Sequence, residues 1–477
     1  MPPLPETEQD GLRNRKVVSS KDKELRTPKS FTWAEVAKHN TSDSCWVTIH
    51  GKVYDITKWL NRHPGGKEVL LLTAGRDISI AFESYHPFTN KAHDLLHKFE
   101  IGVVLDTEFP PYRVDTEFYG DIRQSVNKYF VDNKLDHKNP IYGLWRMAIV
   151  MPLALILSYY AYGPTDISFS VRLVFAIVFG IFQALPLLHV MHDCSHMAFG
   201  HSERWWMFWG RLFMDWYVGC SMTSWHNQHT IGHHIYTNIF KADPDCPVAE
   251  KDGDLRRIVK RQAWAYTSQF QYIYLPIMYG FLGMLMRYAD ITEVFTAMKN
   301  GPVRVNPHGF LGHLEHILSK LFFCFWRIYL PLSYGMPLST FLPLFAATEL
   351  MTGYWLAWNF QVSHISDVAD FPLSEKEEKT IDQEWAVAQT VSSVNYSLGN
   401  WFTTFCCGAL NYQIEHHLLP TVSQYHYPAI APIVKEICRK HGVRYNELPN
   451  YYSAFYHHVK HLYNMGQKGE VAELHLG

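Results

Sequence analysis

Three histidine-rich stretches decide the fold: HDCSH at residues 192–196, HTIGHH at residues 229–234 and QIEHH at residues 413–417. Side chains three or four residues apart lie on one face of a helix, so each stretch presents at least two polar side chains to the same side. Imidazole is the commonest metal ligand in proteins, and this chain carries 27 histidines in 477 residues. The stretches therefore predict a metal centre built from segments that are far apart in the sequence.

The number of available ligands indicates how many metal ions the centre holds. The three stretches supply seven imidazoles: His192, His196, His229, His233, His234, His416 and His417. A tetrahedral zinc site takes four ligands, whereas seven nitrogens suit two ions that keep open positions for oxygen. A carboxylate-bridged pair of ions would need Glu-x-x-His motifs, which the chain lacks after residue 106. We therefore expect a histidine-rich centre with two metal ions.

Four apolar segments surround these stretches: Met147–Tyr162, Leu173–Val190, Leu321–Tyr334 and Phe341–Phe360. At 1.5 Å per residue the second and fourth are long enough to cross a hydrocarbon core of about 30 Å, and the other two need flanking residues. Arg327 makes the third segment the weakest of the four. Buried core helices of a soluble protein are the alternative, but the pairing of the segments favours membrane insertion.

Charge outside the apolar segments predicts their orientation. The turns at residues 163–171 and 335–339 contain no Lys or Arg, whereas basic clusters lie at residues 256–261 and 435–444. By the positive-inside rule, both termini and residues 192–320 face the cytosol. The eight cysteines include no Cys-x-x-Cys pair, which is consistent with reduced thiols.

The start of the chain indicates no secretory signal, because the first 30 residues contain no apolar run. We expect residues 1–30 to form a disordered tail. Across the whole chain 43 Lys and Arg nearly balance 45 Asp and Glu, for a net charge of -2. This balance argues against a nucleic-acid-binding surface.

Residues 31–105 are predicted to form a compact α+β domain. A His-Pro-Gly-Gly turn occupies residues 63–66, and a second histidine, His86, follows 23 residues after His63. Two neutral imidazoles on opposite sides of a haem would fill both axial positions of its iron. Such a haem is closed to oxygen and transfers electrons.

The motifs around this turn resemble cytochrome b5. Residues 54–60 precede the turn as Tyr-Asp-Ile-Thr-Lys-Trp-Leu, and residues 74–77 follow it as Ala-Gly-Arg-Asp. The resemblance covers the whole domain and implies haem b with His63 and His86 as ligands. Tyr85 and Pro87 flank His86 where that family often has Gly and Ser.

The chain from about residue 107 to its C-terminus resembles the membrane fatty acid desaturases, in the order and spacing of its three histidine boxes. Gln413, in the first position of the third box, marks the front-end subgroup, whose members carry a fused cytochrome b5. The resemblance implies two iron ions held by the seven box histidines, by His364 after the last apolar segment and by Gln413. Asn359, His189 and His226 are left outside this ligand set, in supporting or structural roles.

The resemblance implies oxygen-dependent insertion of a cis double bond between an existing double bond and the carboxyl end of a polyunsaturated acyl chain. Residues 187–193, 233–238 and 424–432 look most like Δ5 desaturases of oomycete and algal type, which act on C20 acids such as dihomo-γ-linolenate and eicosatetraenoate. Δ6, Δ8 and Δ4 desaturases and a sphingolipid long-chain-base desaturase remain alternatives. A zinc transporter or haem carrier would want acidic ligands at mid-membrane, where only Glu349 is available.

The expected architecture is a cytochrome b5-like α+β domain (31–105), a linker (106–140) and an all-α membrane domain (141–477). The last has about four transmembrane helices and a cytosolic helical cap that holds the metal. The resemblance further implies electrons from NADH through cytochrome b5 reductase, O2 as co-substrate, and an acyl chain carried on phospholipid or CoA. The expected location is the endoplasmic reticulum membrane.

Overall fold

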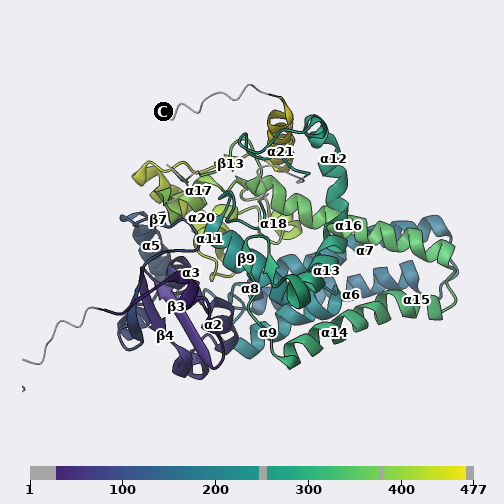
Figure 1. The fold of residues 1–477 in the computed structure, drawn as a ribbon. Helices are drawn as coiled ribbons and strands as arrows, with labels where there is room; N and C mark the ends of the chain where they lie inside the picture. Colours follow the sequence, from purple (N-terminus) through teal and green to yellow (C-terminus); the bar gives the residue numbers. More distant parts are fainter. Residues whose placement is uncertain (1–27, 247–254, 373, 376–379, 469–477) are drawn as a thin grey trace, which may run out of the picture.

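The computed structural model describes residues 28–246, 255–372, 374–375 and 380–468. Within these residues an N-terminal α+β unit lies at one side of the molecule, long helices extend to the other side, and shorter helices fill the space between them (Figure 1). Most of the tail predicted for residues 1–30 lies outside the described residues, and Ser30 already belongs to the first strand.

The N-terminal unit is a mixed sheet covered by short helices, as predicted. Its strands are β1 (Ser30–Phe31), β2 (Asn40–Thr41), β3 (Ser44–Ile49), β4 (Lys52–Asp55), β5 (Arg76–Asp77) and β6 (Glu100–Val104). They pair in the order β1-β6-β4-β3-β2, and β5 joins β3. The helical segments are α1 (Trp33–Val36), η1 (Thr57–Arg62), α2 (Lys67–Thr73), α3 (Ser79–Tyr85) and α4 (Lys91–Leu96). Alternating apolar residues such as Val47 and Ile49 face the core of this unit.

The segment expected to be a linker contains a packed helix, α5 (Phe118–Asp132). Its apolar residues recur every fourth position: Phe118, Ile122, Val126 and Phe130. This spacing makes one continuous apolar face, which is buried against α20 (Tyr427–His441) and its neighbours. The two halves of the chain are therefore joined by a structured element.

The long helices are α6 (Ile141–Tyr162), α7 (Phe169–Pro186), α14 (Phe310–Cys324) and α16 (Leu338–His364). The four-residue helix α15 (Leu330–Ser333) lies between α14 and α16 in sequence and contacts α16. Helix α7 lies between α6 and α16 and continues through the π-helical turn η2 (Leu187–Met191) into α8 (His192–Ser195). In the described part of the chain, two helices are long and apolar enough to cross a membrane, at Ile141–Tyr162 and Phe169–Ser195.

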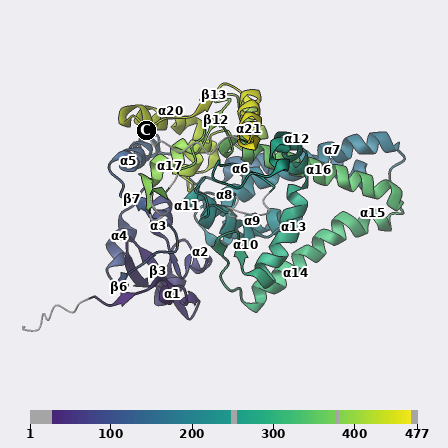
Figure 2. The same cartoon turned by 45° about the horizontal axis from the view of Figure 1, so that its top comes forward.

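Shorter helices cover the end of this bundle nearest the N-terminal unit (Figure 2). They are α9 (Glu203–Arg211), α10 (Met222–Trp225), α11 (His234–Tyr236), α12 (Gln271–Met278), α13 (Leu282–Thr292), α17 (Trp385–Val391), α18 (Trp401–Cys406), α19 (Gln413–Leu418) and α21 (Tyr451–Gly466). The remaining turns are η3 (Leu212–Tyr217), η4 (His226–His233), η5 (Tyr266–Phe270), η6 (Tyr279–Phe281), η7 (Glu293–Ala297), η8 (Phe325–Tyr329) and η9 (Gln424–His426). Short strands complete the described part: β7 (Tyr112–Arg113), β8 (Lys299–Asn300), β9 (Val303–Arg304), β10 (Ser374–Glu375), β11 (Thr380–Glu384), β12 (Asn395–Tyr396) and β13 (Glu447–Leu448).

Candidate metal centre

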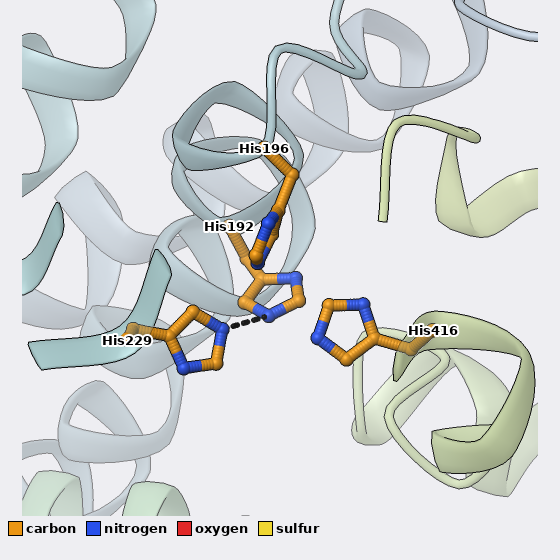
Figure 3. A group of neighbouring side chains, drawn as sticks. All are labelled: His192, His196, His229 and His416. Carbon is orange, nitrogen blue, oxygen red and sulfur yellow. Dashed lines mark hydrogen bonds between the residues drawn. The ribbon is translucent and has the colours of Figure 1, made fainter. Parts of the chain in front are cut away.

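Four imidazoles converge from three elements that are distant in sequence (Figure 3). His192 begins α8, His196 directly follows its last residue, His229 lies on η4, and His416 lies on α19. One nitrogen from each ring lies within 4.8 Å of the other three, and Nε2 of His192 is 3.1 Å from Nε2 of His229. We call these four residues the first histidine group.

A second histidine group lies beside the first. It consists of His233 on η4, His364 at the end of α16 and His417 on α19. Nε2 of His364 is 3.4 Å from Nε2 of His233 and 3.2 Å from Nε2 of His417. The Gln413 amide is 2.8 Å from the same His364 nitrogen. The side-chain amide of Gln413 therefore lies within this group.

His234 lies between the two groups. Its Nε2 is 3.2 Å from Nε2 of His229, and its ring also forms a possible metal-binding set with His416 and His417. All nine residues singled out in the sequence thus meet in one place, and none is more than 6% exposed. The helical spacing explains the arrangement, because His229 and His233 share one face of η4 and His416 and His417 project from one short helix.

In the second histidine group, the hydrogen bonds of the rings favour the tautomers that can bind a cation. Nδ1 of His417 lies 2.8 Å from Gln389 Oε1. Nδ1 of His364 lies 3.3 Å from the Ser392 carbonyl oxygen. These oxygens only accept hydrogen bonds, so each Nδ1 donates its hydrogen and each neutral ring keeps a lone pair on Nε2. Lone pairs that face each other at 3.2 Å repel unless a positive charge lies between them. The donor set therefore fits a metal ion.

His233 shows the same preference for positive charge. Its Nδ1 is 3.1 Å from the Asp243 carboxylate, which is fully buried. Burial lowers the pKa of His233, but the charge of Asp243 outweighs this effect and raises it to about 9. A metal ion on Nε2 would supply that positive charge in place of a proton.

Other rings of the two histidine groups and His234 favour the neutral form, which can bind a metal ion. Burial is the main reason why the pKa values of four histidines lie well below the ordinary value: His229, His234, His416 and His417. Nε2 of His196 and Nε2 of His416 are buried and lack a hydrogen-bond partner among the described residues. Metal coordination would satisfy both atoms.

The residues that orient these rings could not be predicted from the motifs. Asp243 and Gln389 hold His233 and His417, the Tyr427 hydroxyl is 3.2 Å from Nδ1 of His416, and the Tyr85 hydroxyl is 3.0 Å from Nδ1 of His196. Such outer partners fix the tautomer and the direction of a metal-bound imidazole. They lie outside the boxes, at separations from 10 to 111 residues from the histidines they contact, so motif spacing could not identify them.

The neighbours left out of the ligand set lie beside the centre. His189 contacts Arg146, with 3.1 Å between Nδ1 and Nη1. The Asn359 amide donates to the Trp355 carbonyl oxygen at 2.6 Å. Among the described residues, neither these two nor His226 belongs to a group with metal-binding geometry.

The N-terminal unit brings its two histidines close together. The rings of His63 and His86 are 6.3 Å apart between centroids. Two metal–nitrogen bonds of about 2 Å each, together with the ring radii, fill a gap of this size. Nδ1 of His63 donates to the Gly66 carbonyl oxygen at 3.1 Å, and Nδ1 of His86 donates to that of Phe82 at 2.8 Å. Both Nε2 atoms therefore keep their lone pairs, which fits haem ligation.

The two glycines of the turn are required by close contacts. A Cβ on Gly65 would lie 2.8 Å from Cε1 of His63. Gly66 has φ +95°, and a Cβ there would overlap the Glu203 carboxyl group of α9. The His-Pro-Gly-Gly motif thus positions His63 and also makes room for the other half of the molecule.

An apolar pocket lies next to the first histidine group. His192 forms part of its wall, together with Met191, Trp225, Met286 and Leu356. Gly283 and Phe360 line it further. The exposed surface of these walls is almost entirely apolar, and His192 belongs both to the pocket and to the metal-binding group.

These features are typical of a membrane enzyme with a histidine-rich metal site that is joined to a haem-binding domain. Residues 167–449 match the family model described as "Fatty acid desaturase", and residues 32–105 match "Cytochrome b5-like Heme/Steroid binding domain". The chain belongs to the fatty acid desaturase family and is an oxidoreductase. Membership implies iron and O2, and the N-terminal domain implies haem.

Curated relatives match along nearly the whole chain. Acyl-lipid (8-3)-desaturase B of Dictyostelium discoideum is 38% identical, over 92% of this chain and 94% of its own length. Delta(5) fatty acid desaturase A of the same organism is 38% identical, over 94% and 96%. Acyl-lipid (8-3)-desaturase of Mortierella alpina is also 38% identical, over 92% and 97%.

Proposed function

We propose that this protein introduces a cis Δ5 double bond into C20 polyunsaturated acyl chains, such as dihomo-γ-linolenate and eicosatetraenoate. The observation that carries the proposal is the nine-residue ligand set beside an apolar pocket. The names of the relatives, Delta(5) and acyl-lipid (8-3), support this regiochemistry and favour an acyl chain on a lipid over one on CoA.

The proposed ligands are His192, His196, His229, His233, His234, His364, Gln413, His416 and His417, which would hold two iron ions. Bound iron supplies the oxidising power needed to remove hydrogen from an unactivated methylene group. The chain's own residues orient the ligands, through Asp243 at His233 and Gln389 at His417. The apolar pocket excludes water and places the methylene groups beside His192.

Electron supply is assigned to the N-terminal domain. His63 and His86 would hold haem b, and its electrons would come from NADH through cytochrome b5 reductase. With two electrons and two protons, removal of two hydrogens from the acyl chain reduces one O2 to two waters. With His63 and His86 both as ligands, the haem would supply electron transfer and would not bind oxygen.

In the membrane we propose four crossings, with α14 to α15 and α16 forming the second hairpin. The Arg327 guanidinium within this hairpin is 3.2 Å from the Glu349 carboxylate, which Arg287 also contacts. Paired charges of this kind can lie at membrane depth when they face the bundle interior. The termini and the metal centre would face the cytosol, and the protein would reside in the endoplasmic reticulum.

Expression in yeast fed single C18, C20 and C22 polyunsaturated acids tests the function. Mass spectrometry of the products should place the new double bond at Δ5 of C20 acids. A new bond at Δ4, Δ6 or Δ8 would replace the proposed regiochemistry, and desaturated sphingoid bases would replace the substrate class.

Gly283→Leu tests the pocket as the acyl site. Beyond its own helix backbone, the nearest atom to a Cβ on Gly283 is Nη2 of Arg287, 3.8 Å away, so a larger side chain can enter the pocket. We expect kcat/KM for C20 acids to fall about tenfold or more, because pockets discriminate single methylene groups by such factors. Gly120→Leu on α5 is the matched control, and equal activity of the two variants would contradict the assignment.

Gln413→Ala tests the one ligand that is not a histidine. The amide is 2.8 Å from the His364 ring and 3.3 Å from that of His417, and its oxygen is buried without a partner among the described residues. We expect roughly 10- to 100-fold lower desaturation, with the haem spectrum and membrane insertion unchanged. Gln413→His should remain impaired, because an imidazole differs from an amide in shape and donor strength. Full activity of Gln413→Ala would remove the residue from the site.

A further inference from the structure

Tyr85 connects the two candidate redox sites. It is the last residue of α3 and directly precedes the haem-ligand candidate His86. Its hydroxyl lies 3.0 Å from Nδ1 of His196 in the first histidine group. Its ring packs against the apolar core of the N-terminal unit and also against the core around α7 to α10. One side chain therefore reaches from a haem-ligand segment to a metal-ligand ring.

The hydrogen bond has the polarity that metal binding requires. When Nε2 of His196 binds a metal, Nδ1 carries the hydrogen and donates to the Tyr85 oxygen. Thr230 donates to the Ser195 carbonyl oxygen at 3.4 Å and so ties η4 to the residue before His196.

The position of Tyr85 is fixed by specific docking between the two halves. Arg304 donates to the carbonyl oxygens of Ala37 and Gly75, at 2.9 and 2.8 Å. Asn306 donates to the Ala74 carbonyl oxygen at 2.9 Å. Glu203 accepts from the backbone N–H of Glu68 at the start of α2, also at 2.9 Å. These contacts surround α2 and hold the N-terminal unit in one orientation.

We propose that Tyr85 is the positioning residue that couples the haem site to the metal centre, through the covalent link to His86 and the hydrogen bond to His196. The inference rests on the proposed function. In each transfer one electron leaves ferrous haem, which becomes ferric, and reduces one ferric ion of the centre to ferrous. Two transfers supply the electrons for one double bond.

Anaerobic flash reduction of the haem in the full-length, iron-loaded protein tests the coupling. The decay of the ferrous haem band reports arrival of the electron at the metal centre, with neither oxygen nor acyl substrate present. Tyr85→Phe should slow this decay roughly 10- to 100-fold while the haem spectrum, haem potential and iron content stay at wild-type values. Tyr85→His, which keeps a hydrogen-bonding ring, should recover part of the rate.

Two further variants separate coupling from simple orientation of a ring. Tyr119→Phe is the matched control, since it removes a buried hydroxyl that donates to the Leu418 carbonyl oxygen at 3.0 Å. Its decay rate should equal that of wild type. Tyr427→Phe loosens His416 from the other side and should slow the decay, per bound iron, less than Tyr85→Phe does.

A wild-type decay rate in Tyr85→Phe, or equal losses in Tyr85→Phe and Tyr427→Phe, would overturn the proposal. Failure of the proposed function has a different signature, since it would show as wild-type protein that forms no desaturated product from any fed acid.

Discussion

Replacing His417 by Ala is expected to abolish desaturation and to remove iron. His417 belongs to the second histidine group and also to the set with His234 and His416, so its loss affects both metal positions. We expect the product to fall at least about 100-fold, the upper range for disturbed metal sites. Metal analysis of purified protein and gas chromatography of the fatty acids measure the two effects.

An exposed histidine provides the control for this loss. His201 contacts Asp136 at the surface, and His201→Ala should keep wild-type iron and activity. His417→Ala protein that retained two iron ions and full activity would exclude the residue from the ligand set. Zinc without iron in active wild-type protein would refute the iron centre itself.

Replacing His63 or His86 by Ala is expected to remove the low-spin haem spectrum of the full-length protein. Each ring supplies one axial position, and the main-chain bonds from Gly66 and Phe82 already orient both rings. Desaturation should fall in parallel, with a small remainder supported by the host's free cytochrome b5. Absorption spectra and product analysis of the same preparations check both parts.

The matched control for the haem variants is His97→Ala, an exposed position in the same domain. Its spectrum should be unchanged. A low-spin spectrum that survives in His86→Ala would show that another residue is the second ligand.

Much of the candidate site could be predicted because its ligands follow local rules. The box histidines recur at helical spacing, and their positions around η4 and α19 follow from that spacing alone. The outer partners could not be predicted in this way. Gln389 meets His417 only because α17 packs against α19, and Asp243 is an unremarkable loop residue until the chain folds.

In the membrane half, too, some features can be predicted from local composition, and others depend on tertiary contacts. Apolar composition alone identifies α6 and α7 as long enough and apolar enough to cross a membrane. Arg327 weakened the third predicted segment, and Glu349 was the lone acid in the fourth. The structure pairs the two side chains at 3.2 Å. The two opposite charges compensate each other through a contact between different helices. The composition of either segment alone could not predict this contact.

The close approach of Glu203 to Gly66 restricts which haem-binding domains can replace the native one in a chimaera. The space that a Cβ would fill in the haem-binding turn is taken by a carboxylate from the catalytic half. A chimaera that imports a foreign electron-transfer module without glycine at this position would strain the turn, where φ is +95°, and would displace the acidic side chain that caps α2. The haem-binding domain and the catalytic domain are therefore adapted to each other at this contact. An exchange of domains between distant relatives has to transfer the residues at positions 66 and 203 together.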